Sequence, residues 1–345
     1  MIVHIMMDEK YTSEFVKFIN EKYNYNEVNH VFIVMSRHNQ LKYELIDNNN
    51  VVLVGQKTKD VFKFIKYIKK ADRIISHGLF NHYMIYLLFF LCVSKKVVWG
   101  IWGGDLYDYK NESGIFKYIK TKSIQQFLGV CTHIKADADF ARKVYGFKGK
   151  YFPCLMYQSC LVAPCNQKIS IHKNNNSIKI LIGNSADDSN RHLDILEKIK
   201  QLNDSNVEFI IPLSYGPQDY ADEVEEKYKN IFGDKVRTLR KFMPREEYYA
   251  LLAEIDVAIY AHKRQQAVGN ITQLLGLGAK IYLEPFVTTF GWLTEMGIKV
   301  FNYEELDKSV IVPLTIEEKE KNNKAICSFA SMDALNKQLD ELFLI

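Results

Sequence analysis

The sequence predicts an α/β protein built from two Rossmann-like domains, and three observations favour this class. The chain has 345 residues, more than one hydrophobic core usually serves. Short runs of β-branched residues alternate with helical patterns, which is typical of parallel sheets covered by helices. The alternation stops over residues 153–177, where Pro, Cys, Asn and Lys accumulate, and then begins again. We therefore expect an N-terminal domain over 1–155, a linker over 156–177 and a C-terminal domain over 178–345, whose last helix could pack back on the first domain.

The hydrophobic periodicity gives the elements in order along the chain. In the first domain it predicts strands over residues 2–6, 31–35, 51–54, 73–77, 96–102 and 130–134, and helices over 12–23, 58–70, 80–93, 115–128 and 137–145. In the second domain it predicts strands over residues 178–182, 207–211, 236–239, 257–260, 280–283 and 299–301. Pro244 is expected as the first residue of a helix, where its missing N–H costs nothing. Sheets of this kind bind ligands outside the carboxyl ends of their strands, so two tandem domains predict a cleft.

The composition excludes several classes of protein. Hydrophobic residues make up 48% and charged residues 25% of the chain, as in an ordinary folded protein, and the net charge is only +4. The six cysteines form no CxxC pair and no secretory signal precedes the first strand, which favours free thiols in a reducing cytoplasm. The longest apolar run, residues 83–93, is far shorter than the about 20 residues that a bilayer requires, so no transmembrane helix is expected.

Polar residues follow three strands of the second domain and could bind an anion. Strand 178–182 ends at Gly183, and a strand that breaks into small polar residues before a helix offers backbone N–H groups to a ligand. Strands 207–211 and 257–260 also end in polar loops, and Arg264 in the latter could neutralise a diphosphate. Each loop alone is more often a simple turn or helix cap. Their agreement on one sheet edge favours a nucleotide-diphosphate site made by Gly183, Asn184, Ser185, Ser189, Ser214, Tyr215, Gly216, Gln266, Gly269 and Asn270.

Other nucleotide and metal sites lack their signatures. Neither strand 2–6 nor strand 178–182 is followed by the Gly-x-Gly-x-x-Gly of a dehydrogenase, and no P-loop Gly-Lys-Ser/Thr occurs. Asp137 and Asp139 lie at the start of a helical run, where acidic residues suit the helix dipole, so we interpret them as capping residues. We therefore expect no cofactor and no metal.

Two polar residues at strand ends of the first domain are candidates for chemistry. His77 ends strand 73–77, and Asp105 follows strand 96–102 after a glycine turn. Either residue could act as a general base or hold a substrate hydroxyl. Alternatively, Asp105 caps the turn that follows it and His77 closes a buried network, and the sequence leaves both interpretations open.

The predicted helix over 58–70 is strongly amphipathic. Its spacing places Lys59, Lys63, Lys66 and Lys70 on one face and Val61, Phe64, Ile65 and Ile68 on another. Such a basic face could rest on an anionic membrane at roughly 1 kcal/mol per lysine, although it could equally be the solvated side of an ordinary surface helix. A second basic and aromatic run over residues 116–122 favours peripheral membrane contact. No nucleic-acid-binding motif occurs, so nucleic acid is not expected as a partner.

Five motifs occur in order between roughly residues 70 and 285. They are His77-Gly78-Leu79-Phe80-Asn81, Trp102-Gly103-Gly104-Asp105-Leu106-Tyr107, Gly183-Asn184-Ser185 continuing to Ser189-Asn190 and His192, Pro212-Leu213-Ser214-Tyr215-Gly216, and Arg264-Gln265-Gln266. Together they resemble glycosyltransferase family 56, the bacterial 4-acetamido-4,6-dideoxygalactose transferases that act in enterobacterial common antigen assembly.

The resemblance implies a GT-B fold, in which two Rossmann-like domains face each other across a cleft. It implies a dTDP-linked deoxy-amino sugar as donor, an undecaprenyl-diphosphate-linked saccharide as acceptor, and a peripheral location on the cytoplasmic face of the bacterial inner membrane, in the synthesis of surface polysaccharide such as O-antigen. Arg264 and helix N-termini at Ser185 and Asn270 would then assist departure of the leaving group in place of a metal. Asp105 or His77 would be the base if the reaction inverts configuration, whereas a retaining reaction requires none.

Two rival functions fit the same fold. A nucleotide-sugar 2-epimerase would need several acids around the sugar and has no use for basic amphipathic helices. A non-catalytic, membrane-associated scaffold would keep the fold without binding a nucleotide.

Overall fold

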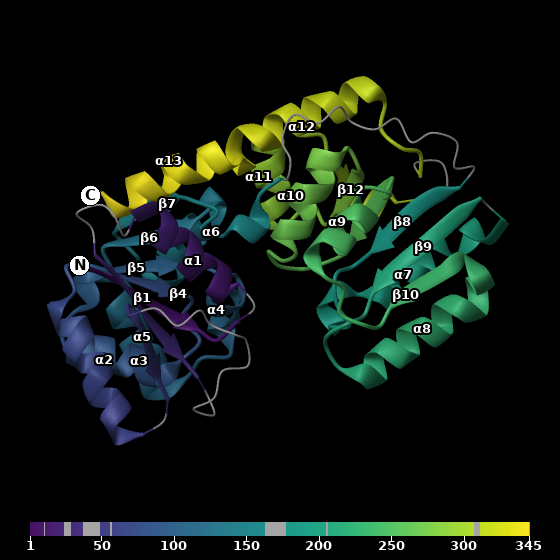
Figure 1. The fold of residues 1–345 in the computed structure, drawn as a ribbon. Coiled ribbons are helices and arrows are strands. Elements are labelled where there is room, and N and C mark those ends of the chain that lie inside the picture. Colours follow the sequence, from purple (N-terminus) through teal and green to yellow (C-terminus); the bar gives the residue numbers. More distant parts are fainter. Residues whose placement is uncertain are drawn as a thin grey trace. The chain divides into compact units, whose positions relative to one another are not determined.

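The computed structural model describes residues 1–9, 11–23, 29–36, 49–55, 57–162, 177–204, 206–306 and 311–344. The chain divides into two compact units, which are treated separately below (Figure 1). Unit 1 comprises Met1–Ser159 and Leu335–Ile345, and unit 2 comprises Cys160–Ala334. Each unit contains one parallel sheet with helices between its strands, so the predicted α/β class is confirmed.

Unit 1 is built on a seven-stranded parallel sheet with the order β3-β2-β1-β4-β5-β6-β7. Its strands are β1 (Ile2–Met7), β2 (His30–Met35), β3 (Val51–Val54), β4 (Arg73–His77), β5 (Val97–Gly100), β6 (Gly129–Thr132) and β7 (Lys150–Pro153). The order reverses between β1 and β4, whose register pairs Ile2 with Arg73. Open α/β sheets bind ligands at such a reversal, outside the carboxyl ends of the strands.

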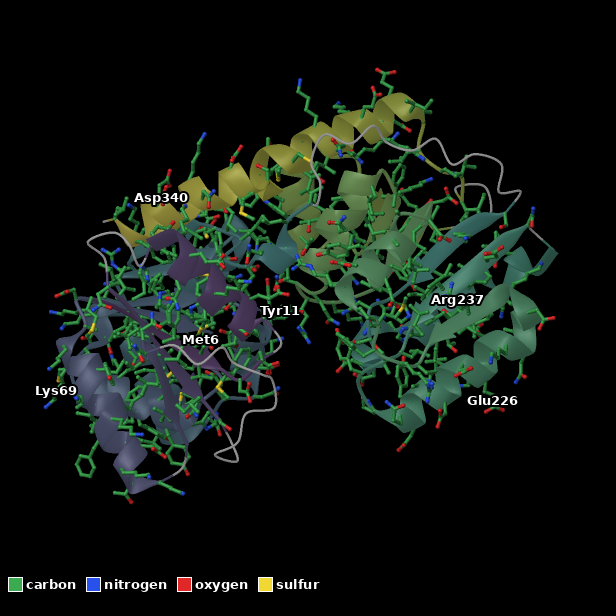
Figure 2. All side chains as sticks on the ribbon, viewed as in Figure 1. Met6, Tyr11, Lys69, Glu226, Arg237 and Asp340 are labelled. Carbon is green, nitrogen blue, oxygen red and sulfur yellow. The ribbon has the colours of Figure 1, made fainter. Side chains whose placement is uncertain are left out.

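The helices of unit 1 include one from the end of the chain. They are α1 (Thr12–Tyr23), α2 (Thr58–Lys70), α3 (His82–Phe90), α4 (Gly104–Tyr107), α5 (Gly114–Ile124), α6 (Lys135–Tyr145) and α13 (Met332–Phe343). In α13 the Asp340 carboxylate, labelled in Figure 2, accepts hydrogen bonds from Lys22 Nζ at 3.2 Å and from the Tyr23 hydroxyl at 2.7 Å. The Arg73 guanidinium donates to the carbonyl oxygen of Leu342 at 2.7 Å. These bonds attach the last helix to unit 1.

Unit 2 is built on a six-stranded parallel sheet with the order β10-β9-β8-β11-β12-β13. Its strands are β8 (Ile178–Ile182), β9 (Val207–Pro212), β10 (Val236–Leu239), β11 (Val257–Tyr260), β12 (Lys280–Leu283) and β13 (Phe301–Asn302). Its helices are α7 (His192–Ile199), α8 (Gln218–Phe232), α9 (Arg245–Leu252), α10 (Val268–Leu277), α11 (Thr288–Glu295) and α12 (Ile316–Ala330). Short 3₁₀ turns occur at Ser94–Lys96, Asp108–Lys110, Gln158–Cys160, Asp188–Asn190, Lys200–Asp204, Gly233–Lys235 and Tyr303–Glu305.

The cores follow from strands that are apolar on both faces, as expected where helices cover a parallel sheet on both sides. Val3, Ile74 and Trp99 are fully buried in unit 1, and Ile182 and Phe209 are fully buried in unit 2. The inner strands of unit 1 also bury polar side chains, among them His4 in β1, His30 in β2 and His77 in β4. Polar groups inside a sheet need partners, and these histidines find one another.

Several elements of unit 1 are shorter than predicted, and for two of them the local reason is clear. The helix expected over 80–93 begins at His82 because the Asn81 side chain accepts a hydrogen bond from the N–H of Met84 at 3.1 Å. It ends before Cys92, which has a left-handed φ of 55°. The strand expected over 96–102 ends at Gly100, and Gly103 with φ of 90° starts the turn into α4.

The expected linker is only partly described. Strand β7 ends shortly before it, inside the expected N-terminal domain, and was not predicted; it lies at the edge of the sheet, where Pro153 is tolerated because no neighbour needs its N–H. Unit 1 continues to Ser159, beyond the boundary expected at residue 155. Residues 163–176, and with them Cys165, lie outside the described residues, while Cys92, Cys131, Cys154 and Cys327 are free thiols.

Helix α2 spans the predicted residues, but its buried face differs from the expected one. Asp60, Phe64 and Ile68 are buried, whereas Val61, expected on the apolar face, is 38% exposed. Asp60 takes the inner position because its carboxylate accepts a hydrogen bond from the N–H of Gly55 at 3.3 Å. Lys59, Lys63, Lys66 and Lys70 are all exposed. Across the described ranges, every helix is too short or too polar to span a bilayer.

Candidate functional site

The loop after β8 depends on a glycine at its first position. Gly183 has φ of +65°, and a Cβ at this position would lie 2.7 Å from His192 Nε2 and 2.8 Å from Asn190 Oδ1. Both the backbone conformation and the space therefore require glycine. The loop then passes through a 3₁₀ turn, and the helix begins only at His192. The expectation of a helix N-terminus at Ser185 is therefore wrong, since Ser185 lies seven positions before the helix.

The same loop is organised by Asn190, which is fully buried. Asn190 Oδ1 accepts a hydrogen bond from the N–H of Asn184 at 2.9 Å and another from His262 Nε2 at 3.0 Å. Its Nδ2 donates to the Ser185 hydroxyl at 3.1 Å and to the carbonyl of Asp187 at 3.0 Å. One side chain thus fixes the loop after β8 and joins it to the loop after β11.

Four of the predicted binding residues form one hydrogen-bonded row, which we call the amide row: Tyr215, Asn184, Gln266 and Ser189. Asn184 Nδ2 donates to the Tyr215 hydroxyl at 3.2 Å, and Gln266 Nε2 donates to Asn184 Oδ1 at 3.3 Å. The Ser189 hydroxyl donates to Gln266 Oε1 at 3.1 Å. The row brings together the loops after β8, β9 and β11. Its neutral amides and hydroxyls can exchange these bonds for bonds to phosphate or sugar oxygens.

The loop after β9 approaches the loop after β8 backbone to backbone. A Cβ on Gly216, whose φ is +113°, would lie 2.7 Å from the backbone of Ala186. The N–H of Ala186 donates to the carbonyl of Tyr215 at 2.8 Å. Ser214 is partly buried beside this contact. Glycine at 216 therefore allows the close approach that places the Tyr215 hydroxyl next to Asn184.

The N-terminus of α10 supplies the donors for an anion. Gly269 and Asn270 lie in its first turn, where backbone N–H groups have no partner within the helix and the dipole is positive. Asn270 Nδ2 donates to the Tyr248 hydroxyl at 2.9 Å. Arg264, in the loop just before the helix, is partly exposed, and its charge helps to lower the pKa of Asp187, although no salt bridge to Arg264 occurs among the described residues. A partly exposed cation beside a helix N-terminus favours bound phosphate.

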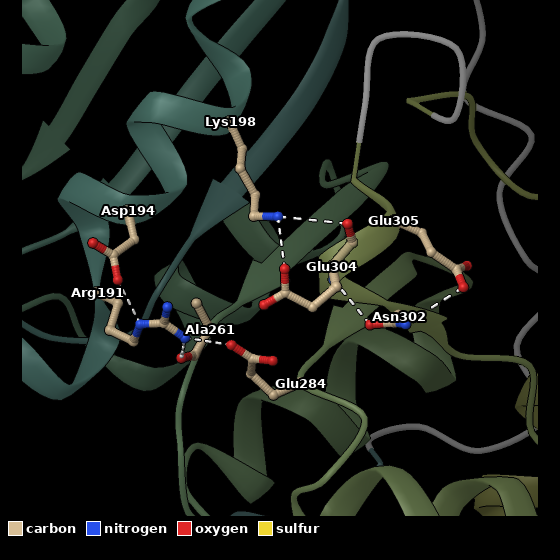
Figure 3. Close-up of polar contacts among 8 residues, drawn as sticks. All are labelled: Arg191, Asp194, Lys198, Ala261, Glu284, Asn302, Glu304 and Glu305. Carbon is tan, nitrogen blue, oxygen red and sulfur yellow. Dashed lines mark hydrogen bonds and ion pairs between the residues drawn. The ribbon is translucent and has the colours of Figure 1, made fainter.

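Charged side chains around Arg191 join the strand ends at this edge of the sheet (Figure 3). Arg191, in a left-handed conformation with φ of 54°, pairs with the Glu284 carboxylate, which is 1% exposed. The Arg191 guanidinium also donates to the carbonyl of Ala261 at 3.2 Å and to Asp194 at 2.6 Å. Glu284 follows β12 and Ala261 follows β11, so one guanidinium holds three strand ends together. Pro244, expected as the first residue of α9, is its N-cap.

The two described histidines of unit 2, His192 and His262, are neutral at pH 7. Burial lowers the pKa of His192 to about 4 and that of His262 to about 3. Because Asn190 Oδ1 can only accept, His262 Nε2 carries the proton of that hydrogen bond. The positive charge offered to a ligand at this edge therefore comes from Arg264 and the helix dipole, not from histidine.

In unit 1, His77 has both ring nitrogens occupied by protein. Its Nε2 lies 3.0 Å from His4 Nδ1, and its Nδ1 makes a short hydrogen bond with the Tyr157 hydroxyl. His77 is 3% exposed, and burial lowers its pKa to about 3. The structure therefore places His77 in a buried network, one of the two interpretations that the sequence left open. Its action as a base stays a prediction.

Asp105 is likewise engaged on every side. Its carboxylate accepts hydrogen bonds from Trp99 Nε1 at 2.6 Å, from the N–H of Leu79 at 3.0 Å and from the N–H of Trp102 at 3.0 Å. Burial raises its pKa, against the opposing effect of these bonds and of Lys120. Asp105 joins the loops after β4 and β5, which favours the capping interpretation, and its action as a base also stays a prediction.

Sequence reasoning missed the residues that hold others in place. The structural role of Asn190 was not predicted, although the residue belongs to the motif that begins at Gly183. His4, His30 and Tyr157 were missed because their only signal is proximity to His77, which depends on strand order rather than on sequence spacing.

Comparison with known proteins agrees with this architecture. A family model described as 4-alpha-L-fucosyltransferase, glycosyl transferase group 56, matches residues 2–338. The solved structure of HepE from Anabaena, in complex with UDP and glucose, superposes with a TM-score of 0.68 over 98% of both chains at 12% identity. A UDP-forming α,α-trehalose-phosphate synthase from Burkholderia vietnamiensis superposes with a TM-score of 0.67 over 100% of both chains at 10% identity. WaaG, a glycosyltransferase involved in lipopolysaccharide biosynthesis, gives 0.62 over 99% of both chains at 10% identity. At these identities the likeness shows the fold alone, which is GT-B.

Proposed function

The chain belongs to glycosyltransferase family 56 and is a glycosyltransferase, and from this premise we propose that it moves a 4-acetamido-4,6-dideoxygalactose-like sugar from a dTDP-linked donor to an undecaprenyl-diphosphate-linked saccharide. The reaction serves bacterial surface polysaccharide synthesis, and the protein works as a peripheral protein on the cytoplasmic face of the inner membrane. Unit 2 binds the donor and unit 1 binds the acceptor.

The observation that carries the donor assignment is the carboxyl edge of unit 2. The amide row, the N-terminus of α10 and Arg264 follow strands of one sheet and offer neutral donors and one positive charge. A nucleotide diphosphate needs both kinds of partner, the charge for its phosphates and the neutral groups for its sugar hydroxyls. Solved structures of this fold include complexes with UDP and glucose and with UDP-2-fluoro glucose.

The sugar assignment rests on the family description. That description names a fucosyl transfer. Fucose is a 6-deoxygalactose, and the proposed sugar has the same skeleton with an acetamido group at carbon 4.

In the proposed reaction, the bond between the anomeric carbon and the diphosphate oxygen breaks while the acceptor hydroxyl oxygen bonds to that carbon. The hydroxyl proton passes to Asp105 or His77 if the reaction inverts configuration, and to an oxygen of the departing diphosphate if it retains configuration. The departing dTDP gains negative charge, which the α10 N–H groups near Asn270 and the Arg264 guanidinium stabilise. Ser185 contributes from the loop after β8 rather than from a helix end. Asp105 shapes the acceptor side by fixing its loops, and His77 acts on it through Tyr157.

The membrane assignment rests on α2. Its four outward lysines are exposed, and Phe62 between them is 68% exposed. A basic face that also presents an aromatic ring suits the headgroup region of an anionic bilayer. A lipid-linked acceptor would be reached from this position.

The decisive experiment incubates the purified protein with a bacterial lipid extract and a panel of dTDP- and UDP-sugars, followed by mass spectrometry of the lipids. We expect a mass increase of one deoxy-amino sugar on a diphosphate-linked lipid, with the dTDP-linked donor preferred. An increase only with a UDP-sugar would overturn the donor assignment.

Control incubations without lipid separate the rival functions. An isomerised nucleotide sugar in the absence of any acceptor would identify an epimerase. Absence of nucleotide binding in calorimetry, together with absence of transfer, would identify a scaffold.

A further inference from the structure

Four aromatic side chains gather at the carboxyl edge of the unit 1 sheet; we call them the aromatic platform. They are Tyr11 after β1, Phe80 after β4, Trp102 after β5 and Tyr157 after β7. The ring centroid of Trp102 lies 6.0 Å from that of Phe80, 6.5 Å from that of Tyr11 and 5.6 Å from that of Tyr157, and Tyr11 lies 6.1 Å from Tyr157. Tyr11 is labelled in Figure 2. Rings from four separate strand ends therefore form one surface where this kind of sheet binds ligands.

The platform stands at the surface rather than in the core. Phe80 is 43% exposed, and the other three rings are partly exposed. Phe80 lies over Gly78, where a Cβ would come within 2.5 Å of its ring, and within 3.5 Å of the Cβ position of Gly104. The missing side chain of Gly78 thus makes room for a ring that is only half covered. A half-exposed ring that its neighbours hold in place is a preorganised contact surface for a ligand.

Beneath the platform, three buried histidines form a line that we call the histidine row: His77, His4 and His30. His77 makes a short hydrogen bond with the Tyr157 hydroxyl, His4 Nδ1 lies 3.0 Å from His77 Nε2, and His4 Nε2 lies 2.9 Å from His30 Nδ1. The three residues come from the adjacent strands β4, β1 and β2. The row ends at His30 Nε2, which is buried and finds no hydrogen-bond partner among the described residues.

The row has a direction. Burial lowers the pKa of His77 to about 3 and that of His30 to about 4. Burial, together with the neighbouring His30 and His77, lowers the pKa of His4 well below its usual value, so each ring is neutral and carries one N–H. Three hydrogen bonds in a line then need every N–H to point the same way. A buried bare lone pair costs less than a buried unpaired N–H, so His30 Nε2 is the unprotonated end. His77 Nδ1 therefore donates to the Tyr157 oxygen.

The direction of the histidine row sets the orientation of the Tyr157 hydroxyl. Its oxygen accepts from His77, so its own hydroxyl hydrogen is directed away from the histidine row. Aromatic faces pack against the C–H side of a sugar ring, and a hydroxyl donor suits a sugar oxygen. No charged side chain belongs to the platform, which makes it unlike the diphosphate site of unit 2.

We propose that the aromatic platform is the subsite for a sugar ring of the acceptor, with Trp102 as its main stacking surface and Tyr157 as a hydrogen-bond donor to a sugar oxygen. This inference rests on the proposed function, because it names the part of unit 1 that contacts the acceptor saccharide. His77, His4 and His30 are positioning residues that fix which way the Tyr157 hydroxyl points.

The test compares Trp102→Ala, Trp102→Phe and Tyr157→Phe with the unchanged protein, at saturating dTDP-sugar and a dilution series of the lipid extract. We expect Trp102→Ala to raise the apparent KM for the lipid acceptor about tenfold and Trp102→Phe to raise it less, since a smaller ring remains. Tyr157→Phe keeps the ring and loses the donor, so kcat falls about tenfold while the KM for the dTDP-sugar stays constant. Tyr83→Ala, which removes a 78% exposed ring elsewhere in unit 1, is the matched control.

The possible outcomes are distinct. An unchanged acceptor KM in both Trp102 variants, or a change in the donor KM instead, overturns the platform while leaving the proposed function intact. Absence of transfer by the unchanged protein overturns the proposed function and this inference with it. Nitrogen-15 NMR of the histidines tests the row without any substrate: protonation of His77 at Nδ1 supports it, and protonation at Nε2 contradicts it.

Discussion

The carboxyl edges of the two sheets carry chemically different side chains, although both sheets are parallel and covered by helices. In unit 2 the strand ends carry small polar groups, with the amide row joining three loops and Arg264 left without an ion pair among the described residues. In unit 1 the strand ends carry aromatic rings, and the polar side chains there, Asp105 and His77, are turned inward and used by the protein itself. The parallel sheet sets where a ligand binds, and the loop chemistry sets what it is.

The difference teaches how a two-unit transferase divides its work. An anion needs N–H groups and a cation that are open to it, which explains an edge of glycine, amide and arginine. A neutral sugar needs apolar faces and a few fixed hydroxyl partners, which explains an edge of rings backed by buried hydrogen bonds. The buried polar groups of unit 1 are the part of this comparison with the largest thermodynamic consequence.

The largest expected effect is that unit 1 is the more acid-sensitive unit. His4, His30, His77 and His133 in unit 1 and His192 and His262 in unit 2 all have a pKa lowered by burial. Unfolded histidine binds a proton near pH 6.5 and these folded ones do not, so stability is present above that pH and is lost as the pH falls towards about 4. At pH 5 each of these histidines lowers the free energy of unfolding by about 2 kcal/mol relative to pH 7. The free energy of unfolding therefore falls by about 8 kcal/mol for unit 1 and by about 4 kcal/mol for unit 2.

Urea unfolding at pH 7 and pH 5 checks this, with tryptophan fluorescence as the probe. Trp99 and Trp102 report on unit 1 and Trp292 on unit 2, so Trp292→Phe and the paired variant Trp99→Phe with Trp102→Phe separate the two signals. An equal loss of unfolding free energy in both units would contradict the prediction that unit 1 is the more acid-sensitive one.

The second effect concerns the lysine face of α2, a feature of unit 1. Replacing Lys59, Lys63, Lys66 and Lys70 together by Gln should weaken binding to phosphatidylglycerol vesicles about a thousandfold, at roughly 1 kcal/mol per lysine. Vesicle flotation measures this. The matched control replaces four exposed lysines of unit 2: Lys200, Lys227, Lys229 and Lys241. The same loss in the control would reduce the effect to net charge and remove the special role of α2.

The third effect concerns the cation of the diphosphate edge. Arg264→Ala should lower kcat about a hundredfold, because the variant loses the charge that faces the departing phosphate, while the urea midpoint stays unchanged. Steady-state transfer assays measure kcat. The neighbouring Lys263 is exposed, and Lys263→Ala is the control that removes one positive charge from the same loop. Near-normal turnover of Arg264→Ala would take it out of the site.

How much of this could be predicted from the sequence depends on the range of the interaction. Helix α2, strand β8 and strand β4 have the predicted bounds because hydrophobic periodicity is a local signal. The meeting of Asn184, Tyr215 and Gln266 was also predictable, since parallel strands end at one edge whatever their order.

The histidine row lay beyond sequence reasoning. It needs β1 between β2 and β4 with Ile2 opposite both His30 and Arg73, and no periodicity gives strand order or register. The sequence could not predict that the Asp105 carboxylate is buried, for the same reason. Its partner Trp99 projects from one face of the sheet or the other depending on the register of the strand. The start of α3 is set by one capping residue, Asn81, and the mainly apolar residues that follow it gave no local signal for that boundary.

The fourth effect tests the inward orientation of Asp105. Asp105→Asn puts an amide NH₂ where an oxygen accepts from N–H groups, so at least one buried donor loses its partner, and unit 1 should lose about 2 kcal/mol of unfolding free energy. Urea denaturation measures this, with exposed Asp108→Asn as control. A fall in kcat of a hundredfold or more with unchanged stability would instead make Asp105 the base and give unit 1 an open charged group like that of unit 2.

The smallest expected effect tests whether the amide row binds the donor. Gln266→Ala removes the bond to Asn184 at 3.3 Å and the bond from Ser189 at 3.1 Å, and the remaining side chains lose the partner that orients them. Because these bonds are neutral and partly solvated, each contributes only about 1 kcal/mol, so the dissociation constant for the dTDP-sugar should rise about tenfold in calorimetry. Gln201→Ala, an exposed glutamine of the same unit, is the control. If nucleotide affinity is unchanged while acceptor KM rises, Gln266 serves the acceptor, and the division of labour between the polar edge and the aromatic edge is not the one described above.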